Sequence, residues 1–218
     1  MKKRNFIIIG LDRFGYNLAI HLEKCGHEVV GIDEDQEKVD RIADLITHAA
    51  VGDPTDKDVL QALDVTQADM AIVALTEDIQ SGVLVTMILK EMGMKNVIAE
   101  STSELHGRIL QKVGADRVIF PEKDMGIRLA KSLGHNSIMD YIDLSDEYSI
   151  IEMCVPEEWA GKTLTELHLR TRYNINVIAF RAQNGELSIN PDPAIPLDKD
   201  SHMVVIGHNM TIDKLVKD

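Results

Sequence analysis

Over its first 120 residues the chain alternates short apolar runs with longer stretches of helical periodicity, and this rhythm leaves few folds open. The runs that we interpret as strands are Phe6–Gly10, Glu28–Asp33, Thr47–Gly52, Ala68–Leu75, Asn96–Glu100 and Arg117–Phe120. The expected helices between them are Phe14–Lys24, Glu37–Leu45, Lys57–Leu63, Ile79–Glu91 and Leu105–Val113. Such alternation is typical of parallel strands covered by helices on both faces. The sequence therefore predicts an α/β fold, a Rossmann-type doubly wound parallel sheet, over residues 1–120.

The pattern changes after Pro121. A helix is expected at Glu122–Leu133, ended by Gly134-His135-Asn136, and Ile138–Ser145 resembles a connecting arm. We therefore assign residues 121–145 to a crossover helix and linker, and residues 146–218 to a small C-terminal α+β domain. Its expected strands are Ser149–Val155, Asn176–Ala182, Glu186–Ile189 and His202–Gly207, its expected short helices are near Leu164–Leu169 and Thr211–Lys217, and Gln183-Asn184-Gly185 indicates a hairpin turn.

Composition and charge exclude several classes of protein. The formal net charge is −13, from 23 Lys and Arg against 36 Asp and Glu, and this field repels nucleic acid and anionic lipid. The strongest apolar runs are strand-sized, so we expect no direct membrane insertion and no signal peptide. Cys25 and Cys154 lie far apart and form no paired motif, which favours a reducing cytoplasm.

The segment Gly10–Gly15 reads G-L-D-R-F-G, a Rossmann fingerprint in which Asp12 replaces the middle glycine. Asp33 closes the second predicted strand, where a carboxylate would hold ribose hydroxyls. The middle glycine lets the backbone approach a pyrophosphate, so Asp12 adds a side chain and a negative charge there; the alternative is that Asp12 only caps the next helix. Arg13 either offsets that charge, grips a phosphate or is a solvated helix residue.

Two further acidic positions have two interpretations each. Asp53 follows the third strand at the carboxyl edge of the sheet, where it would face adenine or ribose, or else help to cap the next helix. Glu122 would offer a carboxylate to a divalent cation shared with a nucleotide phosphate, or would simply favour the first turn of a helix.

No familiar catalytic constellation is present, since the eight histidines are scattered and no nucleophile elbow or Walker loop occurs. A small NAD-dependent oxidoreductase would need a proton donor and a hydride-acceptor pocket, for which we find no candidate pair. A free-standing nucleotide sensor stays open as a second alternative.

Six segments together are far more specific than the glycine fingerprint. They are GLDRFG at 10–15, VGDPT at 51–55, IQS at 79–81 with LKE at 89–91, KVGADRVI at 112–119, PEKDM at 121–125 and DYIDLS at 140–145. In this combination, and over nearly its whole length, the chain resembles the Ktr/Trk potassium-uptake regulatory subunits, which join an N-terminal and a C-terminal RCK domain. The resemblance implies a non-enzymatic cytoplasmic regulator whose dimers assemble into an octameric ring, at the inner face of the membrane, beneath a separate membrane subunit that conducts potassium.

The resemblance also implies ligands for both domains. ATP, ADP or NAD(H) would occupy the Rossmann cleft, with Mg²⁺ or Ca²⁺ at the phosphates, and cyclic di-AMP would bind the C-terminal domain. The nucleotide contacts carried over are Gly10, Arg13, Phe14 and Gly15 at the phosphates, Asp33 at ribose, and Glu122 as the cation ligand. The cyclic di-AMP contacts carried over are Arg170, Ile175 and Asn176, with the segment from Pro191 to Pro193 nearby.

The chain departs from the family pattern at two positions of the nucleotide cleft. Asp12 stands where the family has glycine, and Glu100, near the end of the fifth strand, stands where it usually has lysine. Each change places negative charge beside the phosphates, at a cost on the order of tenfold to hundredfold in affinity. We therefore expect nucleotide binding at the cleft to be weakened or lost, and control to lie with cyclic di-AMP.

Overall fold

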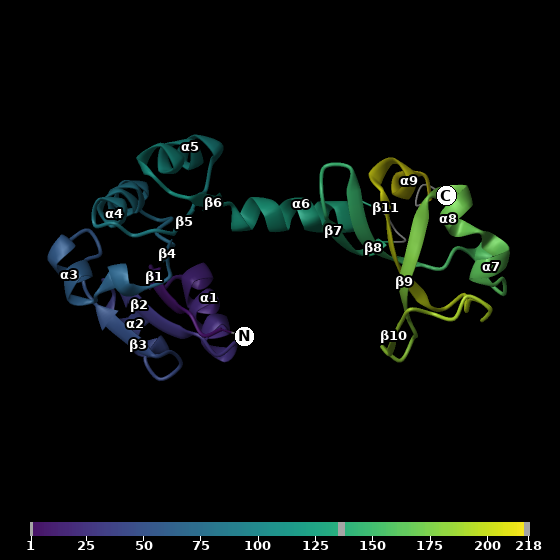
Figure 1. Cartoon of the computed structure of the whole chain (residues 1–218), viewed down its shortest axis with the longest axis horizontal. Coiled ribbons are helices and arrows are strands. Elements are labelled where there is room, and N and C mark those ends of the chain that lie inside the picture. Colours follow the sequence, from purple (N-terminus) through teal and green to yellow (C-terminus); the bar gives the residue numbers. More distant parts are fainter. Residues whose placement is uncertain (1, 135–137, 216–218) are drawn as a thin grey trace. The chain divides into compact units, whose positions relative to one another are not determined.

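The computed structural model describes residues 2–134 and 138–215, which form two compact units that meet between Lys123 and Asp124 (Figure 1). The first unit contains a six-stranded parallel sheet in the order β3-β2-β1-β4-β5-β6. Its strands are β1 (Asn5–Ile9), β2 (Glu28–Asp33), β3 (His48–Val51), β4 (Met70–Val73), β5 (Val97–Glu100) and β6 (Arg117–Ile119). Its helices are α1 (Arg13–Lys24), α2 (Gln36–Ile42), α3 (Lys57–Ala62), α4 (Ile79–Glu91) and α5 (Glu104–Val113), with a short turn η1 (Val65–Gln67). The predicted Rossmann-type fold is confirmed.

The central strand β1 shows why the sheet is covered on both faces. Ile7 and Ile9 pack into one apolar cluster, which includes residues of α3, α4 and α5. Phe6 and Ile8 pack into a second cluster, which includes residues of α1 and α2. Successive side chains of a strand point to opposite faces, so a run of four consecutive apolar residues requires helices on each side. The strand order reverses between β1 and β4, and ligands of such sheets bind at that point, beyond the carboxyl ends of the strands.

The second unit is built on a five-stranded antiparallel sheet in the order β10-β9-β11-β8-β7. Its strands are β7 (Ile138–Asp143), β8 (Tyr148–Cys154), β9 (Ile175–Arg181), β10 (Leu187–Ile189) and β11 (His202–His208). Its helices are α7 (Leu164–Leu167), α8 (Leu169–Tyr173) and α9 (Asn209–Leu215), with a short turn η2 (Glu157–Trp159). The predicted hairpin is present, because β9 and β10 pair across a turn in which Gly185 has a φ of +84°.

One expectation for this region is wrong. Residues 138–143, interpreted from the sequence as part of a connecting arm, form the edge strand β7 paired with β8. The strand is held because Tyr141, only 5% exposed, packs into the core of the second unit. The expected helix stop at His135 and Asn136 lies outside the described residues, as do the last two residues of the expected helix 211–217.

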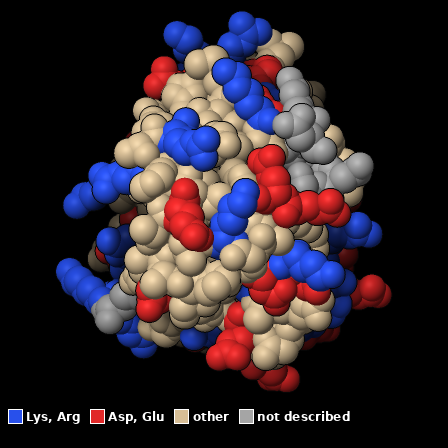
Figure 2. All heavy atoms as spheres, turned by 90° about the vertical axis from the view of Figure 1, so that its right-hand side faces the viewer, with Lys and Arg blue, Asp and Glu red and all other residues tan. Residues whose placement is uncertain are grey.

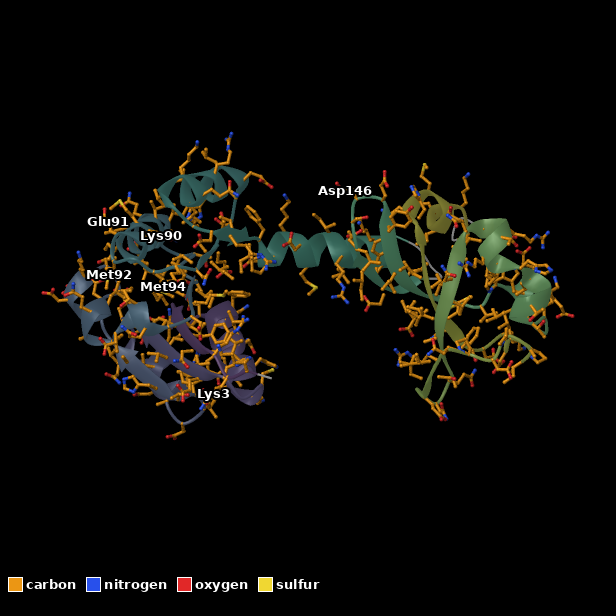
Figure 3. The ribbon with its side chains drawn as sticks, viewed as in Figure 1. Lys3, Lys90, Glu91, Met92, Met94 and Asp146 are labelled. Carbon is orange, nitrogen blue, oxygen red and sulfur yellow. The ribbon has the colours of Figure 1, made fainter. Side chains whose placement is uncertain are left out.

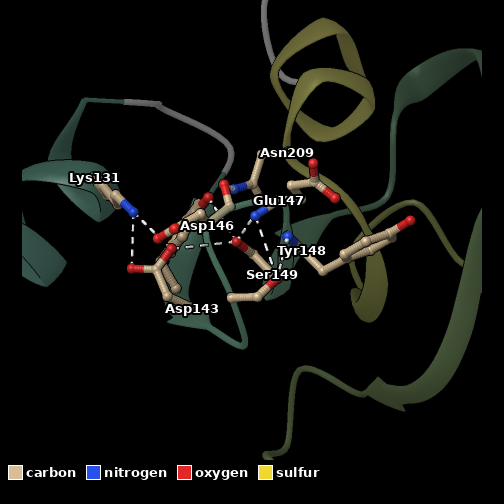
Figure 4. Close-up of polar contacts among 9 residues, drawn as sticks. Lys131, Asp143, Asp146, Glu147, Tyr148, Ser149 and Asn209 are labelled. Atoms are coloured by element: carbon tan, nitrogen blue, oxygen red, sulfur yellow. Dashed lines mark hydrogen bonds and ion pairs between the residues drawn. The ribbon is translucent and has the colours of Figure 1, made fainter.

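The helix α6 (Pro121–Leu133) begins in the first unit and is attached to β7 in the second. Arg128 forms a bidentate ion pair with Asp140, with an Nη2–Oδ2 distance of 2.8 Å. Lys131 Nζ lies 2.6 Å from Asp143 Oδ1 (Figure 4). It also lies 4.6 Å from the centroid of the Tyr141 ring. These contacts explain part of the DYIDLS segment, whose charged members bind α6.

A buried hydroxyl continues this polar network into the second unit. Ser149 Oγ, on β8, donates to Asn209 Oδ1 at 2.6 Å (Figure 4). The same hydroxyl lies 2.8 Å from Tyr141 Oη. The side-chain amide of Asn209 in turn donates to the Asp146 carbonyl at 3.0 Å. Strand β7, strand β8 and the start of α9 are therefore joined by one chain of hydrogen bonds.

None of the helices in the described part of the chain combines the length and the apolar character that crossing a bilayer requires.

Candidate functional sites

The first candidate site is the cleft beyond the carboxyl ends of β1, β2 and β4, and two glycines shape its loop. Gly10 has a φ of +95°, and a Cβ atom there would lie 2.3 Å from the Ala74 carbonyl oxygen. A Cβ atom on Gly15 would lie 1.9 Å from the Gly10 carbonyl oxygen. Both positions are closed to side chains, so the loop has the tight turn and the close helix approach that the fingerprint predicts.

Asp33 lies at the end of β2, where the sequence predicts it, but its carboxylate is already hydrogen-bonded to backbone amides of the protein. The residue is 3% exposed. Its Oδ2 accepts a hydrogen bond from the Leu11 amide at 2.7 Å, and its Oδ1 accepts one from the Asp35 amide at 3.0 Å. The carboxylate therefore ties the phosphate loop to the end of β2, and it would have to share its lone pairs with a ribose hydroxyl.

Asp12 occupies the N-cap position of α1, yet its side chain makes no capping hydrogen bond. Its Oδ1 instead lies 2.7 Å from Nζ of Lys38, a residue of α2, and this Nζ is 3.8 Å from Asp33 Oδ2. Burial acts to lower the pKa of Lys38, but the hydrogen bond to Asp12 and the charge of Asp33 outweigh it, so that the pKa is raised. Sequence analysis missed Lys38, because nothing in the order of residues around it marks a contact with the glycine loop.

The cleft is strongly acidic. Its lining consists of Asp12, Asp33, Glu34, Lys38, Asp53, Pro54, Thr55, Leu75, Glu77, Asp78 and Ser81. Six of these residues are acidic and one is basic. Such a lining repels the phosphates of a free nucleotide and favours a nucleotide whose phosphates carry a bound divalent cation.

The structure shows that Asp53 is not the residue that caps α3, and its expected contact with adenine or ribose stays a prediction. The N-cap of α3 is Asp56, which accepts from the Asp58 amide, so Asp53 is not the cap. Asp53 accepts hydrogen bonds from the Thr55 hydroxyl and amide, at 2.6 and 2.8 Å, and these lower the pKa of its carboxyl. It lies on the cleft wall as an ionised group.

Glu100, at the end of β5, is 4% exposed, and no hydrogen bond or ion pair of its carboxyl is found among the described residues. Burial raises its pKa to about 7, with further contributions from the negative charges of Glu122 and Asp12. The negative charges of Glu122 and Asp12 therefore act together with burial to disfavour ionisation of Glu100.

Glu122, Arg13 and Phe14 complete the residues expected there. Glu122 is exposed in the first turn of α6, and Arg13 is exposed at the start of α1. Phe14 is partly buried against the apolar cluster below β1. No group of three or more His, Cys, Asp or Glu side chains within the described ranges has the arrangement of a metal site. Glu122 as a cation ligand stays a prediction.

The second candidate site is an open cleft in the C-terminal unit. It is lined by Leu164, Thr165, His168, Leu169, Arg170, Thr171, Ile175, Asn176 and Val177, and so unites three of the predicted effector contacts. The fourth, Pro193, lies beside it, since its carbonyl oxygen accepts from the Thr165 amide at 3.1 Å and hydroxyl at 3.0 Å.

Local sequence explains how this cleft forms. Thr163 and Glu166 make a capping box that starts α7, and Leu167 and Leu169 anchor the two short helices in the core. Between them His168 has a φ of +50°, which breaks α7 from α8 and turns the chain. The second helix then presents Arg170 at the cleft and leads directly to Ile175 on β9.

Two arginines of α8 have separate surroundings. Arg170 is exposed and lines this cleft, whereas Arg172 lines a different cavity together with Trp159 and Tyr173. Basic and acidic side chains are interspersed over the end of the C-terminal unit that Figure 2 shows. The described residues on that face form no broad basic patch.

Comparison with known proteins follows this two-unit division. Residues 6–121 match the TrkA-N domain model, and residues 150–217 match the TrkA-C domain model. The chain is 35% identical to Ktr system potassium uptake protein A of Bacillus subtilis, over 98% of this chain and 96% of that protein. It is 36% identical to Ktr system potassium uptake protein C of the same organism, over 99% and 97%. Among solved structures, the GsuK RCK domain superposes with a TM-score of 0.66 at 23% identity, over 99% of this chain and 47% of that one, and shares the fold.

Proposed function

The chain belongs to the family of Ktr potassium uptake proteins that join a TrkA-N to a TrkA-C domain, and from this membership we propose that it is a regulatory subunit of a potassium uptake system. It would act from the cytoplasm, as a homo-oligomer of dimers arranged in an octameric ring, on a membrane subunit that conducts potassium. The relatives described above are named for potassium uptake and not for a reaction, so the oxidoreductase alternative is set aside.

Cyclic di-AMP is the effector that we propose for the C-terminal unit. The observation that carries this assignment is the cleft that gathers Arg170, Ile175 and Asn176, with Pro193 hydrogen-bonded to its wall through Thr165. Arg170 supplies a guanidinium for a phosphate, and Asn176 supplies an amide for a base edge. Two copies of the cleft across a two-fold axis suit a two-fold symmetric dinucleotide.

An adenine nucleotide, ATP, ADP or NAD(H), is the second ligand of this proposal, at the acidic cleft of the N-terminal unit. The glycine loop and Asp33 support a nucleotide there. Asp12 and the buried Glu100 oppose its phosphates, so binding is weak and favours a form carrying Mg²⁺ or Ca²⁺.

Regulation in this proposal is a shift between shapes of the ring. A ligand moves such an equilibrium only by its difference in affinity for the two shapes, and a reversal from 99:1 to 1:99 needs about 5.5 kcal/mol. Each dimer of the octameric ring would hold one effector, so four sites share that demand and each contributes about 1.4 kcal/mol.

The test is calorimetric titration of cyclic di-AMP into the wild-type chain and two matched variants. Arg170→Ala removes the guanidinium that lines the cleft, whereas Arg172→Ala removes the same charge from the same helix at a side chain outside it. We expect binding to wild type and Arg172→Ala, and a loss of at least tenfold in Arg170→Ala with unchanged size on a gel-filtration column. Equal affinity in all three proteins would contradict the site assignment.

A second experiment separates the uptake subunit from a free-standing nucleotide sensor. Membranes from a strain that produces a tagged chain are solubilised in mild detergent, and the chain is purified by its tag. Recovery of a potassium-conducting membrane protein supports the proposed function, and its absence at any effector concentration argues for the sensor.

A further inference from the structure

We propose that Asp12 and Lys38 form an ion pair that closes the N-terminal cleft, and that Lys38 is the group that holds the anionic part of a nucleotide once the pair opens. This closing pair concerns the nucleotide site of the proposed function and rests on it. Neither residue has this role in the fingerprint, where a glycine at position 12 would leave a lysine at position 38 without this partner.

The first observation is that the Asp12 carboxylate places a negative charge of the protein at the N-terminus of α1. The residue lies at that end of the 12-residue helix, where the backbone favours a phosphate, but its side chain caps no backbone amide. Its carboxylate instead lies 2.7 Å from Lys38 Nζ, and only about a third of this side chain is exposed. A negative charge of the protein therefore already occupies the position that a ligand phosphate would take.

The second observation is that Lys38 is the one cation among the residues that line the cleft. Its Nζ faces Asp12 on the glycine loop and Asp33 at the end of β2, so it lies between the sites expected for phosphate and ribose. The side chain is 24% exposed, which leaves it accessible from the cleft. The other charged groups that face it are Asp33 and Glu77, both negative.

Lys38 can therefore neutralise either Asp12 or the anionic part of a ligand, but not both at the same time. While Lys38 neutralises Asp12, it offers a ligand no net positive charge, and when it turns to a ligand it leaves Asp12 unpaired beside the phosphates. Nucleotide affinity then depends on both residues together, and the effects of changing them are not additive. Replacing Asp12 alone would free Lys38 for the ligand.

The experiment measures ADP binding by calorimetry, with and without Mg²⁺, at one fixed salt concentration. The variants are Asp12→Gly, Lys38→Met and the double variant, and Met preserves most of the aliphatic stem of lysine. Arg41→Met, alone and with Asp12→Gly, is the matched control, because Arg41 is also on α2 but lies over the Tyr16 ring, 5.3 Å from its centroid. Cyclic di-AMP binding is measured on every sample.

We expect Asp12→Gly to bind ADP at least tenfold more tightly than wild type, and the addition of Lys38→Met to remove most of that gain. Arg41→Met should leave each affinity within about twofold of its parent. If the Asp12→Gly, Lys38→Met double variant keeps the full gain, Lys38 does not hold the ligand and the proposal is wrong. If Asp12→Gly gains nothing, the pair does not close the cleft. If the wild-type protein does not bind cyclic di-AMP, that result contradicts the proposed function and not the role of the Asp12–Lys38 pair.

Discussion

Glu100→Gln should stabilise the protein by an amount that grows with pH. The Glu100 carboxyl is 4% exposed, and its pKa rises from 4.5 to about 7 through burial and the charges of Glu122 and Asp12. The ionised form is therefore disfavoured in the folded state. The penalty is absent below the unfolded pKa, increases as pH rises, and is complete above the folded pKa.

The size of this penalty follows from the shift. A difference of roughly 2.5 pKa units corresponds to about 3 kcal/mol. Linkage between the two titrations gives less than about 1 kcal/mol near pH 5, about 2 kcal/mol near pH 6, and about 3 kcal/mol near pH 8. Glutamine resembles the protonated carboxyl in size and cannot ionise, so the variant should gain these amounts over wild type.

The assay is urea unfolding followed by far-UV circular dichroism, at several pH values and constant ionic strength. Glu100 is in the N-terminal unit, whereas Trp159, the single tryptophan, is in the other, so tryptophan fluorescence should report an unchanged transition. Glu91→Gln is the control, because Glu91 is an exposed residue at the end of α4 and carries the same charge (Figure 3). A gain for Glu100→Gln that is equal at pH 5 and pH 8 would refute the reasoning.

Three further predictions concern stability, each measured by urea unfolding. Ser149→Ala should cost about 1–3 kcal/mol, because it removes the buried hydroxyl that Tyr141 and Asn209 share (Figure 4); a cost near zero would show that water replaces it. His106→Leu should stabilise by roughly 1 kcal/mol near neutral pH, since both ring nitrogens are buried and have no hydrogen-bond partner among the described residues. Burial also lowers the pKa of His106, so the gain should increase as pH falls below about 6.5, and a gain that shrinks would contradict this. Gly10→Ala should cost at least about 2 kcal/mol, and Gly26→Ala, also at positive φ but with open space around it, should cost less.

The predictable parts of the molecule are those that local patterns determine. The parallel sheet follows from runs such as Phe6–Ile9, whose apolar side chains require cover on both faces, and the cleft follows from Gly10 and Asp33 at the ends of neighbouring strands. Contacts between distant segments were not predictable. Lys38 meets Asp12 only because α2 packs beside the glycine loop, and no spacing rule reports that contact.

Strand β7 illustrates the same limit in the second unit. Its sequence, IMDYID, repeats two apolar residues and one acidic residue and lacks the strict alternation that indicates a half-buried strand. Its identity depends on pairing with β8 and on the contacts of Tyr141 and Asp143. In the same way, the sequence alone does not indicate whether Asp53 or Asp56 caps the N-terminus of α3, and the structure shows that it is Asp56. An acidic cluster offers several equivalent caps, and only the folded backbone selects one.

The position of the seam between the two units has a mechanical consequence. It falls between Lys123 and Asp124, within the first turn of α6 and not in a loop, and the far end of that helix is fixed to β7 by two ion pairs. A loop would absorb a change in the C-terminal unit, but a helix transmits torque along its axis. A change of chain direction at this boundary would have to unwind the first turn of α6 and break its hydrogen bonds, which a loop at the same place would not require.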